Sequence, residues 1–172
     1  MMRITVSVAA VAMLVACQGI SPSAPRASAN LQPTKNGRAS GTVDFYEVGG
    51  KVRVIGKVSG LVPGRQHGFH IHEAGDCSSG DGMSTKGHYN PLGKAHAHFS
   101  TPERHAGDMP VLSADAYGNA SLDTELDVIT VTAGPTSVVG RGLIVHADPD
   151  DYKTQPTGNA GARIGCAVIE RR

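Results

Sequence analysis

The chain has 172 residues and a formal net charge of +1, with 16 Lys and Arg against 15 Asp and Glu. This balance, together with only four Tyr, three Phe and no Trp, argues against a general binder of nucleic acid or of an anionic membrane surface. The 22 Gly and 10 Pro make up about a fifth of the chain, against an average near 12%, which predicts many turns and argues against a helical bundle.

The first 16 residues have the pattern of a secretory signal peptide. A short positive start ends at Arg3, and an apolar run of 13 residues, Ile4–Ala16, follows it. As a helix this run would be about 20 Å long, too short to cross a membrane core of about 30 Å. We therefore expect residues 1–16 to be removed on export.

The apolar run ends in Leu14-Val15-Ala16-Cys17, which resembles the bacterial lipobox. In such signals the Cys is lipidated and becomes the first residue of the mature chain, so Cys17 is the expected lipidation site. In the alternative, an ordinary signal peptide, Cys17 is incidental. Gln18, rather than Asp, follows Cys17 and favours sorting to the outer membrane. We therefore expect the protein to be a membrane-anchored lipoprotein on the periplasmic side of a bacterial envelope.

Residues 17–37 are rich in Ser, Pro, Ala and Asn and contain almost no large apolar side chains. Such a composition buries too little apolar surface to order itself, so we expect a lipidated flexible tether. One domain is expected over residues 38–172.

Within this domain, short runs of alternating apolar and polar residues are separated by Gly-rich and Pro-rich turns. Alternation of this kind predicts strands, and the short links between them favour an antiparallel sandwich or barrel. The predicted strands are Ala39–Glu47, Lys51–Ser59, Gln66–Glu73, Val111–Ala114, Ala120–Leu126, Ser137–Val139, Leu143–Ala147 and Arg163–Ile169. The segment Ala74–Pro110 has no sustained apolar period, and so long an irregular stretch needs ligands or a cross-link to hold it.

If Cys17 is lipidated, Cys77 and Cys166 remain. In an oxidising compartment two such residues, here 89 positions apart in the sequence, are expected to pair. The competing interpretation is one buried and one free thiol.

The eight His residues are the strongest signal in the composition. Alternate residues of a strand point to the same face, so His70 and His72 can hold one metal ion from a rigid base. The irregular segment and the strand after it add further nitrogen and oxygen donors: His88, His96, His98, His105, Asp108 and His146. Such a set suits tetrahedral zinc, and imidazole ligands also suit copper.

Five segments resemble, in their order and spacing, motifs of the copper–zinc superoxide dismutase family. They are Gly68–Glu73 (GFHIHE), Gly87–Pro91 (GHYNP), Glu103–Asp108 (ERHAGD), Gly142–Ala147 (GLIVHA) and Gly158–Cys166 (GNAGARIGC). The resemblance spans about Ala39 to Ile169. It implies an all-β fold, an immunoglobulin-like Greek-key β-sandwich or flattened barrel of about eight antiparallel strands, with long metal-binding and active-site loops.

The resemblance also implies a role for each matched residue. The implied copper ligands are His70, His72, His88 and His146, and the implied zinc ligands are His88, His96, His105 and Asp108, so that His88 bridges the two metals. Asp150 matches a carboxylate that orients one copper His and one zinc His. Arg163 matches the residue that attracts and orients the anionic substrate. Cys77 and Cys166 match the intrachain disulfide.

The implied activity is dismutation of superoxide to dioxygen and hydrogen peroxide, with Cu and Zn as cofactors and protection of the envelope as the result. In this mechanism His88 and Arg163 are the catalytic residues, and His88 takes up a proton when it leaves copper. The alternative function is a non-catalytic copper-binding or copper-chaperone domain of the same fold. A zinc hydrolase is a second rival, but a zinc with four protein ligands keeps no open position for a water.

Some points stay open at this level. His96 is favoured over nearby His98 as a zinc ligand, and His67 is assigned no role because it points away from His70. The segment from His146 to Arg163 lacks the acidic and Lys cluster of animal members and keeps only Lys153. Steering of superoxide could instead come from Lys86 or Lys94, unless these are ordinary solvated lysines. The expected partners are superoxide and a membrane through the lipid anchor. The sequence leaves the oligomeric state open between a monomer and a homodimer.

Overall fold

In a computed structural model, residue 24 and residues 26–172 are described. The predicted signal peptide and Cys17 lie outside these residues. The strands of the described residues are β1 (Arg26–Pro33), β2 (Ser40–Val48), β3 (Lys51–Ser59), β4 (Gln66–His67), β5 (Phe69–His72), β6 (Leu112–Ser113), β7 (Ala120–Leu126), β8 (Gly142–His146) and β9 (Arg163–Arg171). The one helical element among the described residues is a 3₁₀ turn, η1, at Met83–Thr85.

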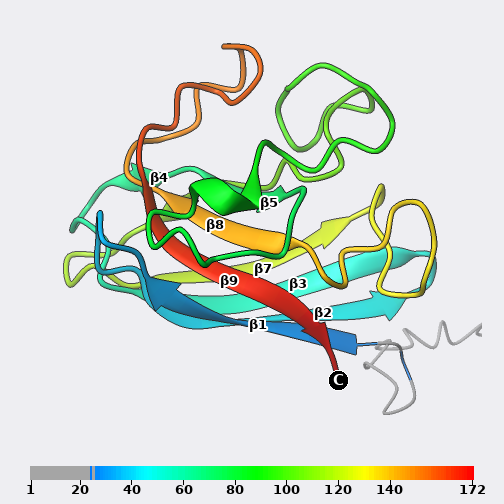
Figure 1. The fold of residues 1–172 in the computed structure, drawn as a ribbon, viewed down its shortest axis with the longest axis horizontal. Coiled ribbons are helices and arrows are strands. Elements are labelled where there is room, and N and C mark those ends of the chain that lie inside the picture. The colour runs from blue at the N-terminus through cyan, green and yellow to red at the C-terminus, as the bar shows by residue number, and fades with distance from the viewer. Residues whose placement is uncertain (1–23, 25) are drawn as a thin grey trace, which may run out of the picture.

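Seven strands form one antiparallel sheet in the order β5-β8-β9-β1-β2-β3-β7, and β4 pairs with β6 in a two-stranded sheet. The large sheet is curled, and two long loops gather beyond one end of it (Figure 1). This architecture confirms the predicted all-β antiparallel fold. No helix in the described part of the chain combines the length and apolar character that a membrane span needs.

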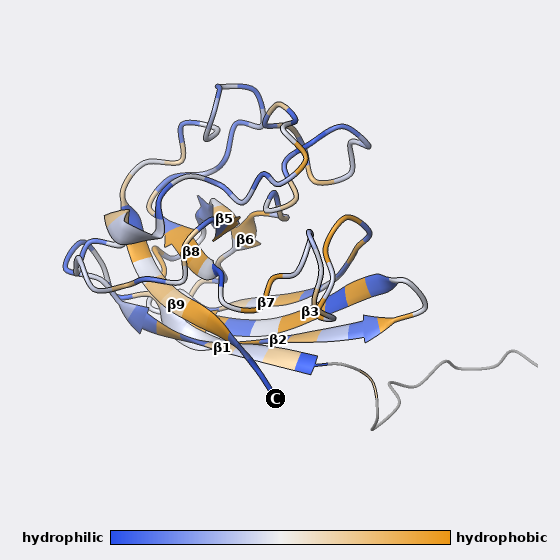
Figure 2. Cartoon of the chain, turned by 45° about the vertical axis from the view of Figure 1, so that its right-hand side comes forward, coloured by the Kyte–Doolittle hydropathy of each residue, from blue (hydrophilic) through white to orange (hydrophobic). Residues whose placement is uncertain are grey.

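The core lies inside the curl. Alternate residues of β3 are buried there, whereas every residue of β5 and β8 is buried. On β3 the buried residues are Val52, Val54, Gly56 and Val58, while the residues that alternate with them are partly or fully exposed. Val54 pairs with Phe45 of β2, which is also fully buried. The same alternation is visible along β2 and β3 in Figure 2. Burial of one face in this way fixes the register, because a slip by one residue would expose the whole apolar set.

The strand β1 corrects the prediction of a flexible tether up to residue 37. Arg26–Pro33 lies inside the large sheet, paired with β2 on one side and β9 on the other. Ala27, Ala29 and Leu31 are at most 1% exposed. Two of these three residues are Ala, so hydropathy alone gives a weak signal of a strand, and pairing with two neighbouring strands stabilises it. The folded domain therefore begins by Arg26 rather than at residue 38.

Smaller differences occur at other predicted strands. Ser137–Val139 is not a strand and forms only an isolated bridge to Thr130. The predicted strand Gln66–Glu73 is interrupted at Gly68, where an added Cβ would lie 2.8 Å from the Ala160 side chain. Close approach of another segment requires Gly at this point and separates β4 from β5.

Two loops position the candidate site. We call residues 73–111, between β5 and β6, the histidine loop, and residues 147–162, between β8 and β9, the closing loop. In Figure 1 they are the green and the orange loops. The histidine loop runs along β5: Ile71 N–H donates to the Gly107 carbonyl at 3.0 Å, and Tyr89 N–H donates to the Ile71 carbonyl at 2.9 Å. These bonds fill the free edge of β5.

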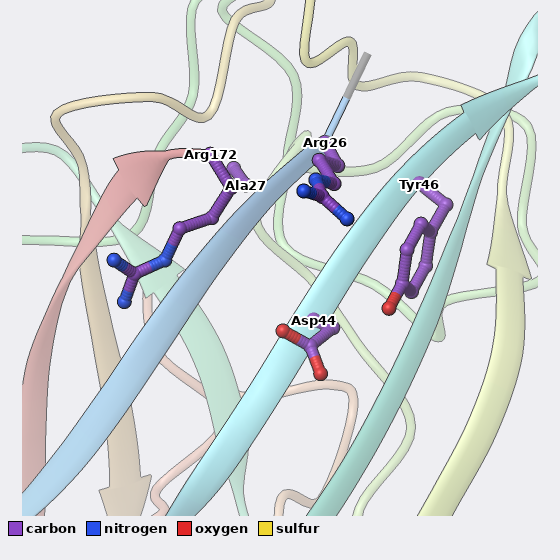
Figure 3. A pocket seen from close by; sticks show the side chains of 5 residues that line it. All are labelled: Arg26, Ala27, Asp44, Tyr46 and Arg172. Carbon is purple, nitrogen blue, oxygen red and sulfur yellow. The ribbon is translucent and has the colours of Figure 1, made fainter. Parts of the chain in front are cut away.

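A shallow pocket of about 250 Å³ borders the start of β1 (Figure 3). Its lining residues are Arg26, Ala27, Asp44, Tyr46 and Arg172. The guanidinium groups share this pocket with the Asp44 carboxylate, and no histidine lines it. The pocket is therefore separate from the candidate metal ligands.

Candidate metal centre

Three predicted ligands come from the paired strands β5 and β8. His70 and His72 are alternate residues of β5, opposite Ile144 and Gly142 of β8. The register of β8 against β9 shifts between Val145 and His146, and such an irregularity re-aims the side chain at the strand end. Rigid strands therefore carry these three imidazoles.

Four buried imidazole nitrogens lack a hydrogen-bond partner. They are Nδ1 of His70 and Nε2 of His72, His88 and His146. The same four residues form one group whose ligand atoms lie within 4.8 Å of one another. A buried polar atom without a partner is costly, and four of them in one place satisfy the donor set that copper prefers. The residues present thus fit a copper ion.

The other ring nitrogen of each of these four histidines is anchored. His70 Nε2 is 2.7 Å from Asp150 Oδ2, and His72 Nδ1 donates to the Lys86 carbonyl at 2.9 Å. His146 Nδ1 donates to the Gly161 carbonyl at 3.2 Å, and His88 Nδ1 lies 3.1 Å from Asp108 Oδ1. Anchors of this kind fix the tautomer and the ring direction that a metal ligand needs.

A second buried group contains His88, His96, His105 and Asp108. Asp108 Oδ1 is 3.1, 2.9 and 3.5 Å from Nδ1 of His88, His96 and His105, and Nδ1 of His105 is 3.4 Å from Nδ1 of His88. A tetrahedron with bonds of 2.0–2.1 Å has edges of about 3.3–3.4 Å. The second group therefore fits a tetrahedral zinc ion, and His88 belongs to both groups.

Two carboxylates hold the second group together. Asp108 also accepts hydrogen bonds from the backbone N–H groups of Ala97 and His105 through Oδ2, at 3.2 and 3.0 Å. Asp150 links the groups, with Oδ2 on His70 and Oδ1 2.9 Å from His96 Nε2. Burial opposes ionisation of Asp108, but hydrogen bonds from His105, His88 and His96 outweigh it and lower its pKa.

Without metal the pKa values of the buried histidines shift in different directions. Burial lowers the pKa of His88 to about 4, despite the hydrogen bond to Asp108. Burial, followed by the charges of neighbouring groups that include Arg163, also holds the pKa of His72 and His146 well below the usual value. For His96 burial acts the same way, but hydrogen bonds to Asp108 and Asp150 outweigh it and raise the pKa to about 9. The first group thus presents neutral imidazoles.

Arg163 lies beside the first group at the start of β9. Its Nη1 donates to the Gly82 carbonyl at 2.6 Å and to Thr85 Oγ1 at 2.9 Å, and Nη2 donates to the Lys86 carbonyl at 2.6 Å. The Lys86 carbonyl also accepts from His72, so a single acceptor joins the Arg to a candidate copper ligand. Lys86 has φ of 64°, a left-handed conformation that is strained for a residue other than Gly.

The structure separates His96 from His98. His96 belongs to the second group, whereas His98 Nδ1 bonds Ser100 Oγ at 2.8 Å and belongs to neither group. His67 is fully buried and contacts the site from behind, because its Nδ1 donates to the His146 carbonyl at 2.8 Å. Its Nε2 accepts from the Val62 N–H at 3.2 Å. In the sequence, only the position of His67 directly before the Gly68–Glu73 motif pointed to this contact.

Both candidate steering lysines are paired with carboxylates. Lys94 Nζ is 2.6 Å from Glu103 Oε2, and Lys86 Nζ is 3.6 Å from Glu73 Oε1. Partial neutralisation weakens the field that either Lys directs at an approaching anion.

Cys77 and Cys166 form the predicted disulfide, with Cα atoms 6.0 Å apart. The bond ties the histidine loop to β9, three residues beyond Arg163. This outcome excludes the alternative of a buried and a free thiol.

The fold and the paired donor groups define a β-sheet metalloprotein with two adjoining metal sites. Residues 39–169 match the family model of copper/zinc superoxide dismutase. The superoxide dismutase [Cu-Zn] of Paramecium bursaria Chlorella virus 1 is 43% identical over 139 residues, which cover 77% of this chain and 73% of the viral protein. The crystal structure of the clock protein EA4 superposes with a TM-score of 0.78 at 37% identity, covering 87% of this chain and 96% of that one.

The chain therefore belongs to the copper/zinc superoxide dismutase family. It is an enzyme that converts two superoxide ions and two protons into dioxygen and hydrogen peroxide, with copper and zinc as cofactors.

Proposed function

We propose that His70, His72, His88 and His146 hold the copper ion and that His88, His96, His105 and Asp108 hold the zinc ion. The four unpartnered nitrogens of the first group carry the copper assignment. The carboxylate and the tetrahedral spacing of the second group support zinc. His88 faces the first group with Nε2 and the second with Nδ1.

Bound copper supplies exchange of one electron with each superoxide ion, while zinc supplies a fixed charge. His88 can hold a proton at Nε2 while its Nδ1 side stays fixed in the second group. A proton at that atom is placed where the peroxide product needs it. This proton can be given up because a zinc ion at Nδ1 would stabilise the deprotonated ring. Asp150 keeps His70 and His96 oriented throughout.

Arg163 attracts and orients superoxide at the mouth of the first group. Its three hydrogen bonds keep the guanidinium in one direction, and its permanent charge suits a small anion. Lys86 and Lys94 are already paired with carboxylates, which makes each a weaker source of attracting charge than Arg163.

Metal analysis and superoxide-decay rates on the same purified samples test these roles. We expect Asp108→Ala to lose zinc and retain copper, and His146→Ala to lose copper and retain zinc. Arg163→Glu should retain both metals and slow the reaction by about 10-fold to 100-fold, which is about 1.4–2.8 kcal/mol in the barrier. Loss of copper with zinc retained in Asp108→Ala would contradict the assignment. A full rate in copper-loaded Arg163→Glu would exclude the role of Arg163.

We also propose that the enzyme acts on the periplasmic side of a bacterial envelope as a lipoprotein anchored through Cys17. The lipobox-like Leu14–Cys17 supports this location, and a disulfide is typical of exported proteins. Because β1 starts at Arg26, eight residues separate Cys17 from the sheet and span at most about 29 Å. The domain would then stay close to the membrane.

Mass spectrometry and fractionation of Cys17→Ser test the anchor. The wild type should carry a lipid and sediment with membranes, and the variant should be blocked in processing or released to the periplasm. An unlipidated wild type, together with unchanged fractionation of the variant, would overturn the proposal.

A further inference from the structure

The side-chain amide of Gln155, in the closing loop, pairs with both main-chain polar groups of His96. Gln155 Oε1 accepts from the His96 N–H at 2.8 Å, and Gln155 Nε2 donates to the His96 carbonyl at 2.7 Å. The reverse orientation of the amide would place donor against donor and acceptor against acceptor, so the pairing defines its direction. In the part of the chain that the structure describes, no other hydrogen bond reaches the main chain of His96.

This pairing replaces the sheet or helix ladder that His96 lacks. Residues 93–98 have no regular secondary structure, although His96 is only 2% exposed. Buried main-chain groups need partners, and Gln155 supplies both. The ring of His96 must meet Asp108 at Nδ1 and Asp150 at Nε2 at the same time. It can do so only if its backbone lies at one position between the two carboxylates.

Gln155 is itself held by the closing loop. Its Nε2 also donates to the Lys153 carbonyl at 3.3 Å. The loop is closed by bonds from Asp151 N–H to the Gly158 carbonyl at 2.9 Å and from Gly158 N–H to the Thr154 carbonyl at 2.7 Å. A restrained loop can transmit its position to His96, whereas a freely moving glutamine would contribute little.

We propose that Gln155 is a positioning residue that sets the backbone of His96 for zinc and fastens the closing loop to the histidine loop. The inference rests on the proposed assignment of zinc to His88, His96, His105 and Asp108. By reciprocity, zinc at His96 would in turn favour the closed arrangement of residues 150–158.

Zinc binding to the copper-free protein tests this role without measuring activity. Gln155→Ala should weaken zinc binding by about 10-fold to 100-fold in competition with a chelator, the usual range for groups that orient a ligand. The cobalt-substituted variant should show an altered d–d spectrum, because His96 meets the metal at a changed angle. Gln155→Glu keeps an acceptor for the His96 N–H but cannot donate to the carbonyl, so its loss should be smaller. Gln155 is exposed at the surface, which favours normal folding of both variants.

Thr154→Ala is the matched control. Thr154 is also exposed, and its hydroxyl donates to Asp151 at 2.6 Å without contact to His96. This variant should bind zinc like the wild type. Equal losses in Thr154→Ala and Gln155→Ala would overturn the proposal, as would wild-type affinity and an unchanged cobalt spectrum in Gln155→Ala. Asp108→Ala tests the underlying assignment separately. If Asp108→Ala still binds zinc, the assignment of the zinc site fails. If Asp108→Ala loses zinc while Gln155→Ala binds zinc like the wild type, only the role of Gln155 is rejected.

Discussion

Gly158 packs against the hydrogen bond that joins Asp150 to His96. A Cβ at this position would lie 1.8 Å from Asp150 Oδ1 and 2.6 Å from His96 Nε2, and the residue has φ of +66°. Both the space and the backbone conformation therefore require Gly. The carboxylate that joins the two metal groups can reach His96 only because this residue has no side chain.

We expect Gly158→Ala to displace Asp150 from His96 and to weaken zinc binding by about 10-fold or more. The strained φ adds a stability cost of about 1–2 kcal/mol, which must be separated from the effect on the site. Gly64→Ala provides that control, because Gly64 has φ of +71° and nothing within 4 Å of an added Cβ. Chelator competition and thermal unfolding of both variants check the prediction. Equal zinc affinity in the two variants would show that contact with Asp150 does not matter.

At the scale of elements, strands with large apolar side chains are predictable, and β1 is not. Lys51–Ser59 is predicted at its observed bounds because Val52, Val54 and Val58 alternate with polar residues. In β1 the inward positions are filled mainly by Ala, so the segment has the composition of a linker. Its conformation depends on pairing with β2 and β9, strands that lie later in the chain. Such pairing is a tertiary property that local composition does not carry.

The same distinction applies to the site. The five motifs contain every member of the two donor groups except His96, which the family resemblance selected by its spacing from His88. The structure brings all of these residues together. The groups that orient them through the main chain were not predicted. Gln155 binds the His96 backbone, and the Lys86 carbonyl joins His72 to Arg163. A backbone acceptor can belong to any residue type, and Gln is common in loops, so neither leaves a signal in a single sequence.

At the scale of the whole molecule, the histidine loop and the closing loop bury a set of ionisable side chains, which are the proposed metal ligands. Of the six histidines in the two donor groups, none is more than 7% exposed. Their pKa values shift in opposite directions, which makes the stability of the metal-free protein depend on pH at both ends of the neutral range.

The acid limb follows from His88, whose pKa burial lowers to about 4. The unfolded chain, with an ordinary His pKa near 6.5, binds more protons than the folded one between these values, so stability falls as pH drops from about 6.5 to 4. His70, His72 and His146, whose pKa values burial also lowers, act in the same direction. On this side of neutrality, acid therefore favours unfolding.

The alkaline limb follows from His96, whose pKa Asp108 and Asp150 raise to about 9 against the effect of burial. Its contribution is fully present below about pH 6.5 and is lost as pH rises through 9, because the folded state then gives up a proton that it held more tightly. We expect the metal-free protein, with a chelator present, to unfold at the highest temperature near pH 6.5 and at lower temperatures at pH 4.5 and pH 9. His96→Gln should flatten the alkaline limb and keep the acid one. A melting temperature that rises steadily from pH 4.5 to 9 in the wild type would contradict the opposed shifts.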